Sequence, residues 1–101
     1  MNKRLVVIIP IYQNELNNAE EKSVDLCRQK LGRCYDLYFI VPNSLNMKNY
    51  AKYRDIKVKR FSDIFFKSTK TYNKLMLDIN FYKTFSDYEY MLIAQTDTLI
   101  L

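Results

Sequence analysis

The sequence predicts an α/β fold: a Rossmann-like parallel sheet of about four strands in β-α-β-α-β-α-β order, with helices on both faces. One observation behind this prediction is that short apolar runs alternate with longer stretches of helical periodicity. Another is that one glycine and two prolines leave few tight turns among 101 residues. Long regular elements with short polar connections should therefore make up a single domain, residues 1–101.

The first two strands are expected at residues 5–9 and 37–41. Both are unbroken runs of apolar, mainly β-branched or aromatic side chains, and a proline follows each of them, at Pro10 and Pro42. An unbroken apolar run is typical of a parallel strand that is covered on both faces. We therefore expect helices on both sides of these two strands.

The first helix is expected to begin after Asn17 or Asn18 and to stop at Gly32. Either asparagine can cap the first turn, and a glycine commonly follows the last turn of a helix. Glu20 and Glu21 fall in the first turn, where the helix dipole favours acidic side chains. The apolar positions of this segment repeat at helical spacing: Val24, Cys27 and Leu31.

Four further elements complete the predicted order. A short helix over residues 47–53 precedes a strand at residues 56–61. The apolar and basic side chains of that strand alternate, as in a strand with an open face or at a sheet edge. The longest helix is expected at residues 72–85 and is apolar around much of its girth. It leads to a fourth strand at residues 88–94.

The composition excludes several kinds of site. The chain has no histidine, which removes Ser-His-Asp and Cys-His relays, a histidine general base and histidine-ligated zinc. Cys27 and Cys34 are expected to be two reduced, buried thiols, with a disulfide as the alternative. No apolar run approaches the ~20 residues of a membrane span. We therefore expect a cytoplasmic protein without a membrane span.

Residues 98–101 form one more apolar run at the end of the sequence. Such a run needs neighbours to cover it, so we expect the natural chain to continue past Leu101 as the N-terminal part of a larger fold. The alternative is a tail that pairs at the sheet edge. Uncovered apolar side chains at this end would favour self-association of the 101 residues on their own.

Candidate ligand-binding residues follow the strands. In an open parallel sheet, ligands bind beyond the carboxyl ends of the strands. The segments expected there are polar: residues 10–15, 42–44, 61–63 and 95–97. Among them, Asp63 and Asp97 carry carboxylates suited to a metal ion or to sugar hydroxyls. The sequence has no glycine-rich dinucleotide motif and no Walker lysine loop, which excludes those two kinds of nucleotide site.

Two stretches resemble a known family. The stretch VVIIPIYQNE is similar to the opening of inverting glycosyltransferases of the GT-A type, in which a buried strand ends in Pro-x-Tyr. The stretch YNKLMLDINFYKTFSDYEYMLIAQTDTLIL resembles the region of those enzymes where a helix leads to a strand that ends in a DxD-like acid. Within it, FYKTFSDYEYMLIAQTD is closer still to a bacterial family of uncharacterised glycosyltransferase-like proteins. The resemblance spans nearly the whole chain.

The resemblance implies a nucleotide-sugar site. It implies that Asp97 meets a Mn²⁺ or Mg²⁺ ion on the diphosphate of a nucleotide sugar such as a UDP-sugar. Asn43 would lie near the base or the ribose. The other residues implied at the site are Pro10, Ile11 and Tyr12 in the nucleoside pocket, Tyr72 and Asn73 facing the same cleft, and Gln95 in the acid motif. The acceptor would be a cell-surface polysaccharide or a lipid-linked glycan.

The sequence also departs from the GT-A pattern. Gln95 stands where a DxD motif has its first carboxylate, so a metal ion should bind more weakly. The acceptor half of such an enzyme follows the DxD region, so the 101 residues are expected to be inactive alone.

Simpler roles stay open for the candidate site residues. Asp97 can be a turn aspartate, the tyrosines can lie at the core edge, and the asparagines can cap turns.

A second hypothesis rests on charge. Residues 48–70 hold eight lysines and arginines against Asp55 and Asp63, in a chain with a net charge of +5. This charge suits a non-catalytic α/β module whose basic face docks an acidic partner. The alternative is a solvated surface in which lysines protect an edge strand. Nucleic acid is not the expected partner, because no aromatic RNA-binding signature accompanies the charge.

Overall fold

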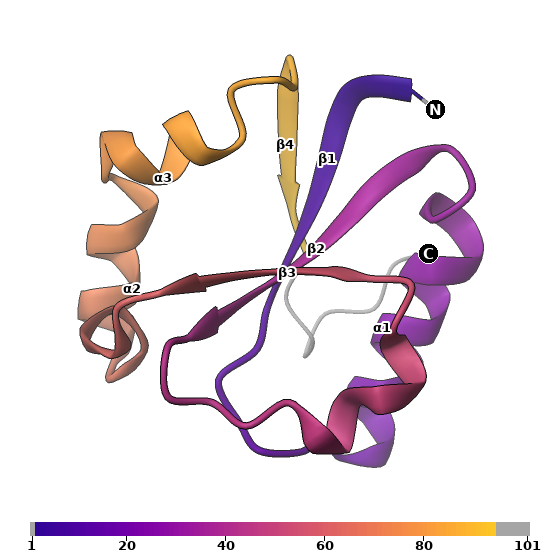
Figure 1. The fold of residues 1–101 in the computed structure, drawn as a ribbon, viewed down its shortest axis with the longest axis horizontal. Coiled ribbons are helices and arrows are strands. Elements are labelled where there is room, and N and C mark those ends of the chain that lie inside the picture. Colours follow the sequence, from indigo (N-terminus) through magenta and orange to yellow (C-terminus); the bar gives the residue numbers. More distant parts are fainter. Residues whose placement is uncertain (1, 95–101) are drawn as a thin grey trace.

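Four parallel strands form one sheet in the spatial order β3-β2-β1-β4 (Figure 1). This is a computed structural model, and it describes residues 2–94, without the side chains of residues 2, 3 and 69. The strands are β1 (Asn2–Pro10), β2 (Tyr35–Pro42), β3 (Lys57–Phe61) and β4 (Tyr90–Ile93). The predicted α/β class, the parallel sheet and the strand order along the chain are confirmed.

Helices connect the strands on both faces of the sheet. They are α1 (Asn18–Leu31), the 3-10 helices η1 (Lys48–Tyr53) and η2 (Asp63–Phe66), α2 (Thr69–Met76) and α3 (Ile79–Thr84). In Figure 1, α1 lies on one side of the sheet and α2 with α3 on the other. Among the described residues, none of these helices has the length and apolar character needed to cross a membrane.

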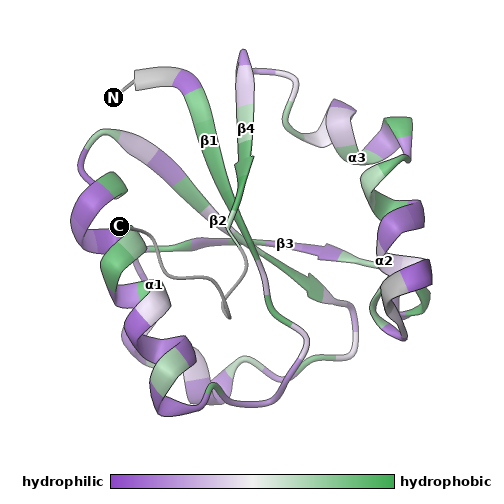
Figure 2. Ribbon diagram, turned by 180° about the vertical axis from the view of Figure 1, so that it is seen from behind, coloured by the Kyte–Doolittle hydropathy of each residue, from purple (hydrophilic) through white to green (hydrophobic). Residues whose placement is uncertain are grey.

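The alternation of side chains along β1 divides the core into two clusters. Val7 and Ile9 face α1 and η1, whereas Val6 and Ile8 face α2 and α3. Each is almost completely buried, and burying such a side chain contributes about 1.5–3 kcal/mol to stability. Figure 2 shows the apolar residues along the strands at the centre of the fold and mainly hydrophilic residues along α1. The uninterrupted apolar run therefore reflects burial on both faces, as predicted.

Local hydrogen bonds set the ends of α1. The Asn17 side chain accepts from the Glu20 N–H at 2.8 Å, and the Asn17 N–H donates to the Glu20 carboxylate at 3.0 Å. Asn17, rather than Asn18, is therefore the cap, and the reciprocal pair satisfies two otherwise free N–H groups. Gly32 ends the helix as predicted. A Cβ atom there would lie 2.5 Å from the Arg28 carbonyl oxygen, which is too close for any residue that has a side chain.

The predicted long helix over residues 72–85 is wrong, because the segment forms two helices that meet at Leu77 and Asp78. The Asp78 side chain accepts from the Asn80 N–H at 2.8 Å and so caps a new helix. At ~100° per residue, one straight helix would point Leu75 and Phe81 about 120° apart. The break lets both side chains enter the same core cluster, and it leaves Leu77 85% exposed.

The two cysteines differ in burial. Both are free, as predicted, and Cys27 is buried under α1, where burial raises the pKa of its thiol. The prediction that Cys34 is also buried is wrong. Cys34 lies in the exposed turn between α1 and β2, where the chain passes over the surface before it enters the sheet.

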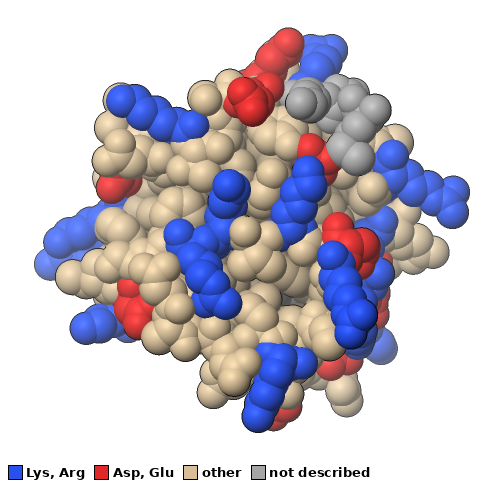
Figure 3. Space-filling model, in the orientation of Figure 1, with Lys and Arg blue, Asp and Glu red and all other residues tan. Residues whose placement is uncertain are grey.

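β3 lies at one edge of the sheet, as its alternating pattern predicts. Its first four residues are exposed. In Figure 3, lysine and arginine side chains cross the middle of the face over β3. Lys57 lies 3.8 Å from the buried Asp36 carboxylate and 5.5 Å from the centre of the Tyr38 ring. Basic side chains at this edge hinder pairing with another strand.

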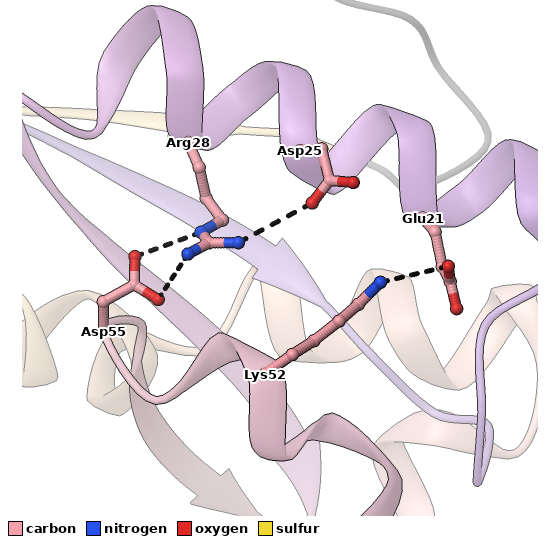
Figure 4. Close-up of polar contacts among 5 residues, drawn as sticks. All are labelled: Glu21, Asp25, Arg28, Lys52 and Asp55. Carbon is pink, nitrogen blue, oxygen red and sulfur yellow. Dashed lines mark hydrogen bonds and ion pairs between the residues drawn. The ribbon is translucent and has the colours of Figure 1, made fainter.

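Ion pairs tie α1 to η1 and to the turn that follows η1 (Figure 4). The Arg28 guanidinium donates to both Asp55 carboxylate oxygens, at 3.1 and 2.9 Å, and lies 3.7 Å from Asp25. Lys52 donates to Glu21 at 3.1 Å. Both cations also lie over the Tyr53 ring, at 5.3 and 5.0 Å from its centre. The two-pronged Arg28–Asp55 contact is the most specific of these, because its geometry matches a carboxylate.

We predict that Arg28→Ala lowers the free energy of unfolding by about 1 kcal/mol, because the variant loses the paired contact and the ring contact. Urea denaturation of the chain and of the variant measures the change. Lys30→Ala, an exposed change in the same last turn, is the control and should have little effect. Equal stability of Arg28→Ala and Lys30→Ala would contradict a role of Arg28 in holding η1.

Candidate functional site

The strand order creates a topological switch point between β1 and β4. From β1 the chain moves to β2 and then β3 on one side, and it returns to β4 on the other side. The Ala94 N–H donates to the Ile8 carbonyl at 2.8 Å, so the ends of β1 and β4 lie side by side. Ligands of open parallel sheets bind outside the carboxyl ends of the strands at such a point. This edge is therefore the candidate site.

The loop after β1 is held in place by η1. Ile11 is buried, and its N–H donates to the Ile40 carbonyl at 2.9 Å. Beyond it, the Tyr50 hydroxyl donates to the Gln13 carbonyl, and the Asn49 amide donates to the Asn14 carbonyl at 3.1 Å. The predicted site residues Pro10 and Ile11 thus form a buried floor. Tyr12 projects from this floor with 58% of its surface exposed.

Arg60 of β3 holds the loop after β2 in place. The Arg60 guanidinium donates to the carbonyl oxygens of residues 42, 43 and 45 at 3.3, 3.0 and 2.9 Å. Asn43 lies in this loop, with its N–H bound to the Phe61 carbonyl at 2.9 Å and its surface exposed. The loop that carries the predicted site residue Asn43 is therefore organised before any ligand arrives.

Asp63 supports the same loop. Its carboxylate accepts from the Ser44 N–H at 3.0 Å. Hydrogen bonding from Ser44, through its side chain and its backbone, lowers the pKa of the Asp63 carboxyl. Asp63 was a candidate for binding a metal ion or a sugar hydroxyl, and in the structure its carboxylate stabilises a turn.

Tyr72 and Asn73 lie in the first half of α2. Ser68 and Thr71 cap this helix reciprocally, with the Ser68 oxygen 3.2 Å from the Thr71 N–H. The Tyr72 ring packs against the core cluster under α2 and α3, and burial raises the pKa of its hydroxyl to about 12. Within residues 2–94, that hydroxyl has no hydrogen-bond partner. Asn73 is exposed.

The predicted cofactor-binding residue Gln95 and the predicted metal ligand Asp97 lie outside the described residues. Residues 2–94 contain no group of three or more acidic or thiol side chains that could hold a metal ion. Asp63, the carboxylate that follows β3, is already bound to Ser44. The described part of the edge therefore does not supply a divalent-metal site by itself.

The N-terminus of α1 opens at the same edge but is unsuited to a phosphate. Its first turn carries Glu20 and Glu21. Glu20 closes the cap, and Glu21 pairs with Lys52. Negative charge next to the N–H groups repels the phosphate that glycine-rich βα loops bind there. This geometry agrees with the absence of a dinucleotide motif in the sequence.

Three residues that organise the edge were missed from the sequence: Asn49, Tyr50 and Arg60. Arg60 was grouped with Lys57 and Lys59 as one basic stretch. Strand alternation could have separated them, because Arg60 points to the face opposite the two lysines. Tyr50 and Asn49 carried no such signal, since their partners lie more than thirty residues away in the chain.

Comparisons with known proteins give one match. A family model described as "Protein of unknown function (DUF5672)" matches residues 55–101. The match includes β3 and β4 and the later of the two stretches that resemble glycosyltransferases, but not the opening stretch at β1. No curated protein and no solved structure matches the chain.

We predict that Arg60→Ala loosens the loop after β2. Loss of a charged donor to three carbonyls should increase amide exchange at Ser44 and Leu45 by about tenfold. Hydrogen–deuterium exchange read by NMR measures this change. Lys59→Ala removes a neighbouring exposed charge and should leave these amides protected. Unchanged exchange in Arg60→Ala would contradict the bracing role.

Alkaline pH should release the loop after β1. Burial, together with the nearby carboxylates of Glu20 and Glu15, raises the pKa of Tyr50 to about 12, against about 10 in an unfolded chain. The stability that Tyr50 contributes is therefore complete below pH ~10 and is lost as the pH rises towards about 12. Tyrosinate absorbance should show a late step, and Tyr50→Phe should lower its amplitude by one tyrosine while Tyr72 keeps its own contribution. A Tyr50 that ionises with the exposed tyrosines would refute this.

Proposed function

We propose that this chain supplies the donor-binding part of a glycosyltransferase, for a nucleotide sugar such as a UDP-sugar, at the carboxyl edge between β1 and β4. One observation carries the proposal. The two stretches that resemble glycosyltransferases are far apart in the sequence, yet they run into neighbouring parallel strands whose ends meet at the switch point. A ligand at this edge would therefore contact both stretches at once.

The proposed nucleoside pocket uses the loops after β1 and β2. Pro10 and Ile11 form its apolar floor, and the exposed Tyr12 ring stacks on the base. Asn43 supplies an amide to the base or to the ribose. The carbonyl oxygens of both loops are already bound to Tyr50, Asn49 and Arg60, so side chains are left to contact the ligand. Because these loops are organised in advance, binding costs less ordering entropy.

The diphosphate end of the donor is assigned to Gln95 and Asp97. Asp97 would hold Mn²⁺ or Mg²⁺, whose charge stabilises a departing nucleoside diphosphate. Asn73, which is exposed in the first half of α2, would reach the sugar, with the partly buried Tyr72 ring beside it. The acceptor in this proposal is a polysaccharide or a lipid-linked glycan.

The test is a titration of the chain with UDP and GDP, with and without Mn²⁺, read by calorimetry or amide NMR shifts. We expect saturable binding that strengthens with Mn²⁺. Tyr12→Ala should weaken it by about tenfold through loss of the stacked ring. Asp97→Ala should remove the effect of Mn²⁺. Tyr90→Ala is the matched control, because Tyr90 is also 58% exposed but lies at the other end of β4.

Absence of nucleotide binding, with and without Mn²⁺, would overturn the proposal. Equal weakening by Tyr12→Ala and Tyr90→Ala would show that binding occurs away from the switch point. In either case the competing hypothesis gains, namely a binding module that meets an acidic partner through the basic side chains over β3. Because Arg60 also braces a loop and Lys57 lies beside the buried Asp36 carboxylate, charge reversal of Lys59 is the cleanest test of that module.

A further inference from the structure

A hollow lies at the amino-terminal edge of the sheet, opposite the candidate site, where α3 leads into β4. It has a volume of about 360 Å³, at the lower end of the range of ligand pockets, about 300–1,000 Å³. One continuous segment lines this amino-edge hollow: Tyr82, Phe85, Ser86, Tyr88, Glu89, Tyr90 and Met91. In Figure 1 this connection lies at the top of the view, away from the carboxyl ends of the strands.

The aromatic walls of the amino-edge hollow are held in fixed orientations. The Tyr82 hydroxyl donates to the Met76 carbonyl, and the Tyr88 hydroxyl donates to the buried Asp36 carboxylate. Phe85 is buried and meets the Tyr38 ring edge-on at 5.2 Å. Tyr82 nevertheless keeps 48% of its surface exposed. A ligand therefore meets apolar ring surfaces that do not have to be ordered on binding.

The polar groups of the hollow are chiefly acceptors. The hydroxyl hydrogens of Tyr82 and Tyr88 are used within the protein, which leaves these phenolic oxygens to accept from a ligand. The hydroxyl of Tyr90, the third tyrosine of the lining, can donate or accept. Glu89 adds a carboxylate, and Ser86 adds a hydroxyl that can donate or accept. The matching ligand has an apolar face for the rings and several hydroxyl donors around it.

Charge at the rim favours a neutral ligand. Arg4 pairs with Glu89 at 3.2 Å, and its guanidinium lies 5.8 Å from the centre of the Tyr90 ring. Because Arg4 and Glu89 neutralise each other, the rim offers no net charge to a cationic or an anionic ligand. A charged ligand would have to break this ion pair to gain a full charge partner. A neutral, polyhydroxylated ring can hydrogen-bond at the rim without breaking it.

We propose that the amino-edge hollow binds a neutral saccharide ring, with its C–H face on Tyr82 and Tyr88 and its hydroxyls on Glu89 and Ser86. This site is separate from the carboxyl edge proposed for the nucleotide and does not depend on it, because the two lie at opposite ends of the parallel strands. A chain with both sites binds a glycan and a nucleotide at the same time. The hollow thereby gives the protein a means of retaining a carbohydrate polymer.

The experiment is an amide NMR titration of the chain with cellotriose, a neutral trisaccharide, compared with choline and glucuronate as cationic and anionic probes. We expect saturable shifts with cellotriose that are confined to residues 82–91. Tyr82→Ala should weaken binding by about tenfold, whereas Tyr82→Phe keeps the ring and most of the affinity. Tyr12→Ala, at the nucleotide edge, should leave cellotriose binding unchanged.

Each other outcome overturns the proposal. Shifts that map outside residues 82–91, or no shifts with cellotriose, show that the hollow is not a saccharide site. Preferential binding of choline or glucuronate shows that the ligand class is wrong. If Tyr82→Ala does not fold, the shift map of the unchanged chain and the affinity of the Tyr82→Phe variant still test whether cellotriose binds in the hollow. A UDP titration of the same samples keeps failure at this hollow distinct from failure at the nucleotide edge.

Discussion

β1 lies between β2 and β4, with a core cluster on each face, so the side chains of residues 6–9 have almost no contact with water. A parallel strand in this position needs helices on both sides, because its neighbours can be reached only by crossover connections. The same constraint brings the carboxyl ends of β1, β2 and β4 to one edge. The burial of β1 therefore determines both the layered fold and the place where loops from distant segments meet.

η1 links the stability of the fold to the order of that edge. On one side, Lys52 and Tyr53 meet Glu21 and the Arg28 guanidinium of α1. On the other side, Tyr50 holds the loop after β1 through the Gln13 carbonyl. A short helix with little intrinsic stability is therefore held by long-range contacts and in turn fixes a candidate binding loop. Perturbation of the α1–η1 contacts should be felt at Tyr12, which adjoins the Gln13 carbonyl that Tyr50 binds.

The sequence predicted the strands that are buried on both faces of the sheet. The runs at β1 and β2 are apolar on both faces, so their pattern has one interpretation. Residues 72–85 are apolar too, but the pattern did not reveal that Leu77 stays in water while Phe81 turns inward at a new cap, Asp78. That choice depends on which side chains the sheet can cover, which is a tertiary property. Strand alternation could separate Arg60 from Lys57 and Lys59, but it could not reveal the three carbonyls that Arg60 binds, because those contacts depend on how the loop after β2 packs.

The two candidate sites differ in how much of the fold each requires. The carboxyl edge proposed for the nucleotide combines loops after β1 and β2, so it exists only when the sheet is assembled. The amino-edge hollow comes from residues 82–91, all within the segment that matches the family model. Even so, the orientation of Tyr88 depends on Asp36 of β2, which lies outside that segment. Local sequence therefore supplies the aromatic rings of the hollow, and the sheet supplies their geometry, so both sites ultimately depend on β1 and β2.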